Sequence, residues 1–304
     1  MSPSAAPVLV VLAAGAARRY GGCKPLAPVG PSGEAVIDLV ASDAVASGFG
    51  AVVLVIHPET GPAIRYHVER CWPSSVDVSF AEQRVPLGTT HATLAARSSI
   101  GTGQPFAVAN ADDVYGLEAF GLLSHQLATG HDEHALVGFQ LAHTVVTDEP
   151  VTRGICEVDA SGHLVGMTER RQVSRLSGGA DFSSLDGLQP EKLDGEATVS
   201  VNLWGFRPEI WGIFDAAMAA SGLDEEYILD QLARGVEVPK AEVLLPEVVG
   251  TAIVSGSGLP VRVLPTDSRC LGVTHADDLP VVQGNLSRQV AWGTRPSRLW
   301  GSLP

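Results

Sequence analysis

Residues 8–15 have the sequence VLVVLAAG, an apolar run that breaks into small residues at its end. A run that stays apolar without alternation is typical of a strand buried on both faces, as in a parallel sheet covered by helices. The small residues predict a loop at the carboxyl end of this strand. Ligands of open α/β sheets bind beyond the carboxyl ends of the strands, so a binding site is expected here.

The first half of the chain continues as an alternation of strands and helices. Expected strands cover Ala51–Ile56, Val76–Phe80 and Phe106–Ala109, and expected helices cover Ala35–Ala46, Ile64–Cys71 and Thr90–Arg97. Such an alternation requires right-handed crossovers between parallel strands. The sequence therefore predicts an α/β fold with a Rossmann-like, doubly wound, mostly parallel mixed sheet and helices on both faces.

The second half is richer in expected strands. These cover Ala135–Gln140, Gly154–Asp159, Thr198–Phe206 and Val261–Leu264, with helices expected at Pro208–Ala219 and Tyr227–Arg234. Residues 172–197 are rich in Ser, Gly and Asp and predict a mobile loop. We expect one domain over residues 1–280, with halves at 1–130 and 131–280, and a C-terminal tail over 281–304.

Composition excludes several classes of partner. The 304 residues carry 34 acidic and 20 basic side chains, a net charge of -14. Because phosphate backbones and anionic lipids attract basic surfaces, we expect neither nucleic acid nor a membrane as a partner. The apolar start, Ala5–Ala17, has no preceding basic residue, which argues against a signal peptide. No apolar stretch approaches the roughly 20 residues that span a bilayer.

The four cysteines are far apart and form no CxxC pair; they are Cys23, Cys71, Cys156 and Cys270. This spacing argues against both a zinc site and a disulfide framework. A reduced cytoplasmic protein is the simplest interpretation.

The loop after Gly15 gathers positive charge in an otherwise acidic chain. Arg18, Arg19 and Lys24 are the only basic residues before Arg65, and lysine occurs only three times in the whole sequence. Small residues allow backbone N–H groups to approach a ligand, and the cations suit a polyphosphate. The sequence fits neither a Walker A loop nor the GxGxxG dinucleotide fingerprint. A strand–loop–helix joint with solvated arginines remains the plain alternative.

Two adjacent carboxylates follow the expected strand at Phe106–Ala109. Asp112 and Asp113 cannot be buried there without a partner, because uncompensated buried charge is costly. Mg²⁺ prefers oxygen ligands and is commonly held by one or two carboxylates together with substrate phosphates. A turn or helix cap leading into Val114 is the alternative.

The first loop resembles the signature of the nucleotidyltransferases that make nucleotide sugars, LAAG-x-G-[ST]-R followed by K-[PQ]-L-x-P-V. The matching positions are Leu12, Ala13, Ala14, Gly15, Arg19 and Lys24–Val29. Ala17 and Arg18 depart from the pattern. The resemblance implies that Leu12 to Gly15 bind the nucleotide and that Arg19 holds its β- and γ-phosphates. It also implies that Lys24 lies near the α-phosphate or the acceptor phosphate.

Later segments resemble the same family in the same order. In the QRVPLGT segment, the resemblance implies that Gln83, Pro86, Gly88 and Thr89 contact the nucleotide, with Gln83 and Gly88 at the base. The strand-end aspartate that binds the catalytic Mg²⁺ in the family falls on Asp112. Leu271 stands where a second metal-binding aspartate is often found, and Asp277 is a weak substitute.

The second half carries the implied acceptor residues, which are Asp113, Gly154, Glu169, Arg170 and Asn202. Arg170 stands where the family has a phosphate-binding lysine. Arg171 or Arg175 could equally make that contact.

The resemblance implies an enzyme that couples a nucleoside triphosphate to a phosphorylated small molecule, above all a sugar 1-phosphate, and releases pyrophosphate. A non-sugar phosphate or phosphonate acceptor and a catalytically silent nucleotide-sugar regulator stay open as alternatives. A nicotinamide oxidoreductase fits least, because Ile56-His57-Pro58 follows the second strand where a ribose-binding acid is needed. Whether the chain forms a homo-oligomer is also open.

Overall fold

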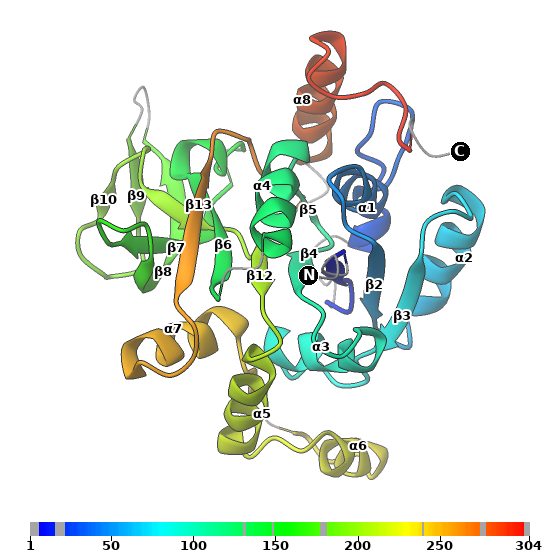
Figure 1. Ribbon diagram of the computed structural model, residues 1–304, viewed down its shortest axis with the longest axis vertical. Helices are drawn as coiled ribbons and strands as arrows, with labels where there is room; N and C mark the ends of the chain where they lie inside the picture. The colour runs from blue at the N-terminus through cyan, green and yellow to red at the C-terminus, as the bar shows by residue number, and fades with distance from the viewer. Residues whose placement is uncertain are drawn as a thin grey trace.

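β1 (Val8–Leu12) lies in the middle of the sheet, parallel to β2 (Ala51–Ile56) on one side and to β4 (Phe106–Asn110) on the other. The computed structural model describes residues 6–15, 22–129, 132–147, 149–176, 181–238, 240–273 and 278–300. Within these residues, twelve strands form one mixed sheet between two groups of helices (Figure 1).

The sheet has the strand order β10-β9-β8-β7-β11-β6-β12-β4-β1-β2-β3, with β13 paired to β6. The pairs among β1 to β4 and the pair β13–β6 are parallel, whereas every pair from β4 through β12 to β10 is antiparallel. The remaining bounds are β3 (Val78–Glu82), β6 (His134–Gln140), β7 (Val151–Val158), β8 (Leu164–Arg175), β9 (Phe182–Ser184), β10 (Lys192–Leu193), β11 (Thr198–Ser200), β12 (Trp204–Phe206) and β13 (Val261–Thr266). A separate small ribbon pairs β5 (Asp113–Val114) with β14 (Leu271–Gly272).

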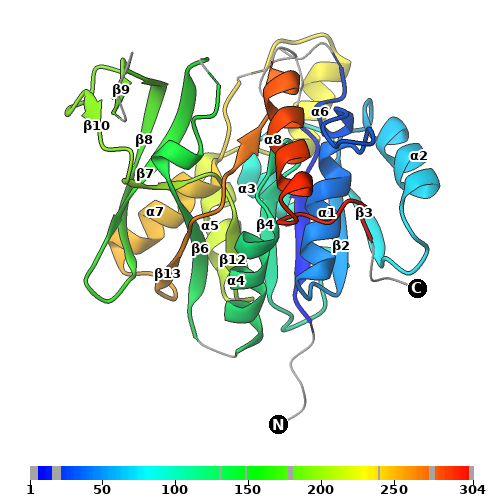
Figure 2. The ribbon, with the colours of Figure 1, turned by 90° about the horizontal axis from the view of Figure 1, so that it is seen from above.

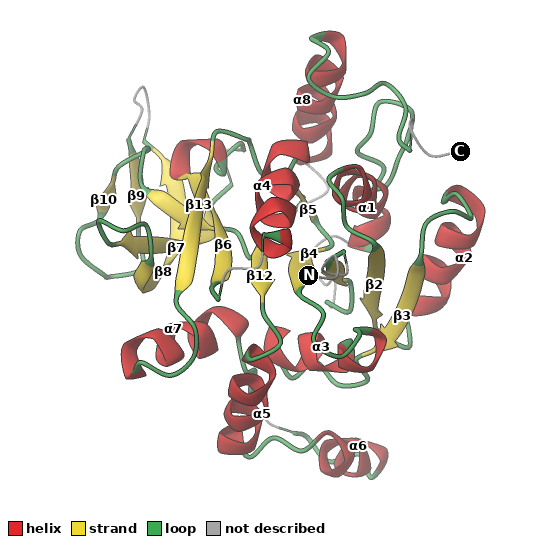
Figure 3. Ribbon diagram, in the orientation of Figure 1, coloured by secondary structure: helices red, strands yellow, loops and turns green. Residues whose placement is uncertain are grey.

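Helices cover both faces, as Figure 3 shows with helices in red and strands in yellow. One face carries α1 (Val36–Ala46), α4 (Leu117–Ala128) and α8 (Leu279–Ala291), which lie in front of the sheet in Figure 2. The other face carries α3 (Thr89–Ala95), α5 (Ile210–Ser221) and α7 (Leu245–Ser255). The other helices are α2 (Gly61–Cys71), α6 (Glu225–Ala233) and the short 3₁₀ turns η1 (Lys24–Leu26), η2 (Arg97–Ser99) and η3 (Leu141–His143). No described helix combines the length and apolarity needed to cross a bilayer.

The sequence of β1 explains its central place. Leu9 and Val11 pack into the core on the α1 and α4 side, whereas Val8 and Val10 pack into the core on the α3 side. All four side chains are at most 2% exposed. Because both faces of the strand are buried, an uninterrupted apolar run is required, and the predicted α/β fold is confirmed.

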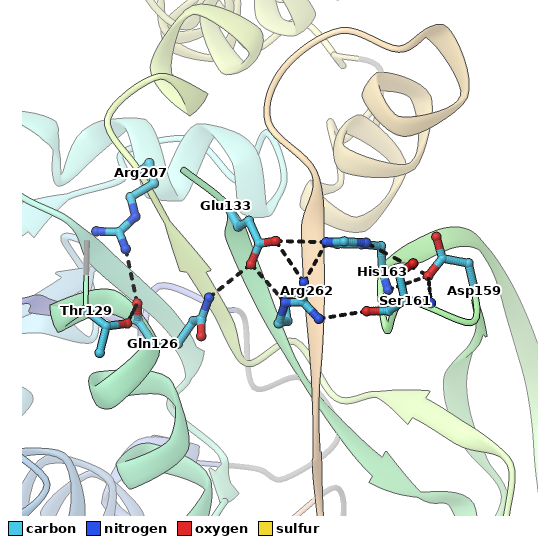
Figure 4. A network of polar contacts seen from close by, with 8 residues as sticks. All are labelled: Gln126, Thr129, Glu133, Asp159, Ser161, His163, Arg207 and Arg262. Carbon is cyan, nitrogen blue, oxygen red and sulfur yellow. Dashed lines mark hydrogen bonds and ion pairs between the residues drawn. The ribbon is translucent and has the colours of Figure 1, made fainter. Parts of the chain in front are cut away.

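A network of ion pairs and hydrogen bonds lies at the edge of the sheet opposite the carboxyl ends of β1 and β4 (Figure 4). β12 runs antiparallel to both β4 and β6, so β6 begins at the edge opposite the end of β4. There Arg262 donates from Nε and Nη2 to the carboxylate of Glu133, at 2.9 Å each, and His163 Nε2 lies 2.9 Å from Glu133 Oε1. Hydrogen bonds from Arg262 lower the pKa of Glu133 to about 2. This cluster joins β6, β13 and the β7–β8 turn.

Two expectations for irregular segments differ from the structure. Residues 172–197, expected as a mobile loop, contain the end of β8 together with β9 and β10. The reason is a network of long-range contacts that polar composition does not reveal. The expected tail begins inside α8, whose Val282 and Leu286 are fully buried, and Arg295 beyond it pairs with Asp43 of α1 at 2.8 and 2.9 Å.

Strand Thr198–Phe206 was expected as one element and is two. β11 pairs with β6 and β7, whereas β12 pairs with β4 and β6. The break falls at Asn202, which has a φ of 64°. Asparagine tolerates this left-handed backbone conformation better than most residues. The turn thus places a polar side chain beside the end of β4.

Candidate active site

The ends of β1 and β4 bring together the first loop and the acidic pair. Lys24 Nζ lies 3.0 Å from Asp112 Oδ2. Lys24 is the first residue of the η1 turn and Pro25 the second, and Ala27 N donates to Lys24 O at 2.9 Å. Both charged side chains keep some exposure, 19% for Lys24 and 35% for Asp112. Lys24 and Asp112 therefore form an ion pair that a ligand can still reach.

Asp113 lies beside Asp112 in a more enclosed position. Asn110 Nδ2 donates to Asp113 Oδ2 at 2.9 Å. A Cβ placed on Gly272, which faces Asp113 in the β5–β14 ribbon, would lie 2.7 Å from Asp113 Oδ1. Burial raises the pKa of the Asp113 carboxyl, and the negative charge of Asp112 adds to the rise. A cation between the two carboxylates would offset both effects.

Asn110 is held by a chain of hydrogen bonds that crosses from β4 to β12. Asn202 Nδ2 donates to Asn110 Oδ1 at 2.7 Å, and Trp204 Nε1 donates to Asn202 Oδ1 at 2.9 Å. The backbone N–H of Asn110 donates to the hydroxyl of Tyr115 at 2.9 Å. Because each amide is oriented by its neighbours, the position of Asp113 depends through Asn110 on Asn202, which lies 92 positions beyond Asn110.

A cavity of about 880 Å³, here called the α6 cavity, opens beside β1, β3 and α6. Its lining includes seven of the predicted nucleotide-binding residues, Leu12, Ala14, Gly15, Gln83, Pro86, Gly88 and Thr89. Asn110 and Asp112 complete its inner end, and Ile228 and Leu232 of α6 cover it. The remaining predicted residue, Ala13, lines a smaller hollow of about 110 Å³ together with Lys24 and Asp112.

The turn at Pro86–Thr89 has a fixed backbone. Gly88 has a φ of 98°, and a Cβ added to it would lie 2.5 Å from Val243 O. The backbone of Val243 pairs with this turn through Val243 N to Leu87 O at 2.9 Å and Thr90 N to Val243 O at 3.1 Å. Only glycine satisfies both the left-handed conformation and the close approach.

The side chain of Gln83 has a defined orientation against the same turn. Its Nε2 donates to Gly88 O at 3.0 Å and lies 3.2 Å from His91 Nδ1. Gln83 is buried, at 5% exposure, yet lines the α6 cavity. Its amide nitrogen is engaged by the turn, so its carbonyl oxygen is the group left for a ligand.

A second cavity, of about 660 Å³, lies between the antiparallel strands and α7 and is here called the α7 cavity. Asp113, Gly154, Glu169 and Asn202 line it, which brings four of the five predicted acceptor residues together. Asn110 lines both large cavities. The two cavities therefore meet beside the end of β4, next to the two carboxylates.

Arg170, the fifth, does not join them. Its guanidinium is 4% exposed, binds Asp186 at 2.9 and 3.2 Å, and donates to Leu188 O and Pro190 O at 3.0 and 2.9 Å. Arg170 thus fastens the segment before β10 to β8 and is absent from the lining of the α7 cavity. Arg170 is not placed to bind the acceptor phosphate as predicted. Its match to the family's lysine in charge does not reveal that Asp186, 16 residues later, binds its side chain.

Arg19, which the resemblance assigns to the β- and γ-phosphates, lies outside the described residues. Arg18 and Asp277 lie outside them as well. Leu271 is fully buried, and its hydrocarbon side chain has no atom that could bind a metal.

The chemistry of Asp112 and Asp113 fits a hard divalent cation. Asp112 lines the α6 cavity and Asp113 lines the α7 cavity, and burial disfavours the anionic form of Asp113 by raising its pKa. Within the described residues, no group of three or more His, Cys, Asp and Glu gathers as a complete metal site. Mg²⁺ is often held by one or two carboxylates while substrate phosphates supply further ligands.

Sequence reasoning missed Asn110 and the whole of α7, both of which line the α7 cavity. Asn110 stands two residues before Asp112, and its place at the end of the expected strand was a usable signal. α7 had helix signals as well, with Pro246 in its first turn, Gly256 at its end and apolar residues Leu245, Val248, Val249 and Ala252 at helical spacing.

Comparisons with known proteins bear on the type of domain and on the fold. Residues 9–157 match the family model of the MobA-like NTP transferase domain. Among solved structures, the chain resembles the inositol-1-phosphate CTP transferase from T. maritima with a TM-score of 0.60 and 12% sequence identity, over 92% of this chain and 96% of that one. At this identity the likeness shows the fold alone. No curated protein sequence matches the chain.

Proposed function

Because this chain belongs to the nucleotidyltransferase family through its NTP transferase domain, we propose that it couples a nucleoside triphosphate to a sugar 1-phosphate and releases pyrophosphate. The observation that carries the proposal is the junction of the two large cavities at Asn110, beside Lys24, Asp112 and Asp113. A triphosphate in the α6 cavity and a phosphorylated acceptor in the α7 cavity would meet at this junction.

The residues divide between the two substrates. Leu12 to Gly15 and the Pro86–Thr89 turn would hold the nucleotide, with the Gln83 carbonyl oxygen and the Gly88 backbone at the base. Arg19 would bind the β- and γ-phosphates. Gly154, Glu169 and Asn202 would contact the acceptor from β7, β8 and the β11–β12 turn.

The reaction needs placement and charge rather than a general base. A phosphate monoester has a second pKa of about 6 and is largely dianionic at neutral pH, so its oxygen can attack the α-phosphorus directly. The new bond joins acceptor oxygen to α-phosphorus, and the bond from α-phosphorus to the bridging oxygen breaks as pyrophosphate leaves. Lys24, 3.0 Å from Asp112, would neutralise charge at the α-phosphate. Mg²⁺, held by Asp112 with Asp113 beside it, would supply further charge neutralisation when bound.

The cellular setting follows the sequence-based expectation. We propose a cytoplasmic enzyme that acts on small molecules and has neither nucleic acid nor a membrane as a partner. The four cysteines are free thiols, in keeping with a reducing compartment.

A matrix of the common nucleoside triphosphates against sugar 1-phosphates, with and without Mg²⁺, tests the proposal by release of pyrophosphate. We expect release with one base and one group of acceptors, and loss of the rate on addition of EDTA. A rate unchanged by EDTA would contradict the metal role. Phosphocholine and simple phosphonates extend the matrix to non-sugar acceptors.

A catalytically silent regulator is the second candidate, because Leu271 is fully buried where the resemblance expects a second metal-binding aspartate. Binding of a nucleotide sugar without release of pyrophosphate from any pair in the matrix would favour it over the enzyme.

A further inference from the structure

The side-chain nitrogen of Gln83, at the wall of the α6 cavity, is fully engaged by the protein. The residue follows β3, and its backbone is fixed because Gln83 N donates to Ile56 O at 2.9 Å. In the side chain, Nε2 donates to Gly88 O at 3.0 Å and lies 3.2 Å from His91 Nδ1. An amide nitrogen carries two N–H groups and accepts no hydrogen bond. Gly88 and His91 therefore take up both of its donors.

His91 fixes which way round the amide of Gln83 lies. Because the amide nitrogen can only donate, its contact with His91 Nδ1 requires a ring nitrogen that carries a lone pair and no proton. Burial lowers the pKa of His91, which keeps the imidazole neutral at neutral pH. The reversed amide would place Gln83 Oε1 against Gly88 O, two acceptors with no hydrogen between them. The carbonyl oxygen of Gln83 is thus directed away from both partners.

Gln83 Oε1 is the atom left for a ligand. Within the described part of the chain no residue donates a hydrogen bond to it, and it is not one of the fully enclosed atoms that lack a partner. Gln83 lines the α6 cavity together with the Pro86–Thr89 turn. A ligand in this cavity therefore finds an acceptor at Gln83 and no side-chain donor.

We propose that His91 is a positioning residue that holds Gln83 as a pure acceptor, so that the α6 cavity selects a nucleobase with an exocyclic amino group over uracil and thymine. This inference rests on the proposed function, which places the base at Gln83 and Gly88, and it adds the class of base.

The hydrogen-bonding edges of the bases explain the selection. Cytosine, adenine and guanine each carry an amino group that can donate to Gln83 Oε1. Uracil and thymine carry one N–H between two carbonyl oxygens, so an acceptor that approaches this N–H also meets an oxygen. Pairing that oxygen would need an N–H from the Gln83 amide, and both are engaged. An acceptor left without a partner in this way should weaken binding by about 10- to 10²-fold.

Binding of triphosphates in the absence of acceptor tests the base preference without turnover. Calorimetry with Mg²⁺ compares CTP, GTP, ATP and UTP, and then compares the tightest of them with a counterpart that lacks the amino group. That counterpart is UTP for CTP, and ITP for ATP or GTP. We expect the tightest amino-bearing triphosphate to bind at least about tenfold more tightly than both UTP and its counterpart. Equal or tighter binding of UTP or of the counterpart, or no binding of any triphosphate, would overturn the inference.

Two variants test the role of His91 itself. His91→Leu removes the acceptor for Gln83 Nε2, whereas His91→Asn offers the oxygen Oδ1 in its place. We expect His91→Asn to keep the preference within about threefold of wild type and His91→Leu to lose most of it, because the amide of Gln83 can then turn. The matched control is His125→Leu on the exposed side of α4, which should keep the full preference. If His91→Leu weakened binding of amino-bearing and carbonyl bases equally, the positioning role would be overturned.

Release of pyrophosphate separates the base preference from the proposed function. If no pair in the matrix releases pyrophosphate while the preference for an amino-bearing base is present, the proposed function fails and the assignment of Gln83 and His91 stands. If UTP or TTP gives the fastest release, the proposed function stands and the assignment is overturned. Thermal melting checks that both variants at His91 are folded. Should His91→Leu not fold, the comparison of His91→Asn and wild type across the same triphosphates decides, and loss of the preference in folded His91→Asn would overturn the assignment.

Discussion

In the parallel half of the sheet, the site residues follow the ends of strands: Ala13 to Gly15 follow β1, and Asp112 follows β4. In the antiparallel half, they stand along β7 and β8 or come from α7, as Gly154, Glu169 and Thr251 do. In the first half, the carboxyl ends of neighbouring strands thus position the site residues. In the second half, side chains from segments far apart in the sequence come together. Local changes should disturb the first half sharply, whereas the second half depends on long-range contacts.

Asp112→Asn should give the largest effect, because it removes charge at the point where both halves meet. The amide keeps the shape of the side chain but cannot neutralise the positive charge of Lys24. It also binds a divalent cation less strongly than a carboxylate does. We expect turnover to fall by about 10³-fold, with only a modest change in triphosphate binding. Steady-state release of pyrophosphate measures the first quantity, and calorimetry the second.

Asp215→Asn is the matched control, since Asp215 pairs with Arg97 on the surface at 2.9 Å and should leave turnover unchanged. Turnover of Asp112→Asn within tenfold of wild type would show that the junction is not the reaction centre.

Gly88→Ala should give the next largest effect, confined to the nucleotide side. The new Cβ would meet the backbone of Val243 at 2.5 Å, so the turn must move. We expect the KM for the triphosphate to rise by about 10²-fold while the KM for the acceptor changes little, because misplacement by about 1 Å can cost that much.

Gly103→Ala separates the effect of backbone strain at a positive φ from the effect of the steric clash with Val243. Gly103 also has a positive φ, 74°, but a Cβ there would have nothing within 4 Å. This variant should lose about 1 kcal/mol of stability and keep both KM values. If Gly88→Ala behaved in the same way, the close approach to Val243 would have no role in nucleotide binding.

The same contrast explains what the sequence could predict. β1, β2 and the loop residues Leu12 to Gly15 were predictable because a buried parallel strand requires a continuous apolar run and its end lies at the site. Lys24 stood out because lysine is rare in this chain. These are local signals, readable from a few consecutive residues.

The antiparallel half lacked such signals. Arg170 and Asp186 are 16 residues apart, and nothing in either segment alone shows that they form a pair at 2.9 Å. Asn202 was predicted as an acceptor residue, but its bond to Asn110 spans 92 positions. Arg153 directly precedes the predicted Gly154, yet its orientation depends on Thr144, on the far side of the loop before β7. Register and side-chain orientation across distant strands decide these contacts.

His134 offers a smaller effect, at the seam where β6 of the second half pairs with β12. The residue is 2% exposed, its Nδ1 accepts a hydrogen bond from Arg207 N at 3.1 Å, and burial lowers its pKa to about 4 from 6.5. Because the folded pKa lies below the unfolded one, the unfolded state binds more protons below pH 6.5. Stability should therefore fall as pH drops from 6.5 toward 4 and level off below that.

The predicted loss is about 2 kcal/mol between pH 7 and pH 5, from 1.36 kcal/mol per pKa unit. Urea unfolding of wild type and His134→Phe at both pH values measures it, because the variant cannot titrate at this position. Phenylalanine leaves Arg207 N without its partner at every pH, so that cost is constant and cancels from the difference. We expect the stability of His134→Phe to approach that of wild type at pH 5. Parallel pH profiles for the two proteins would mean that the seam accommodates a protonated histidine and is looser than the buried strands of the parallel half.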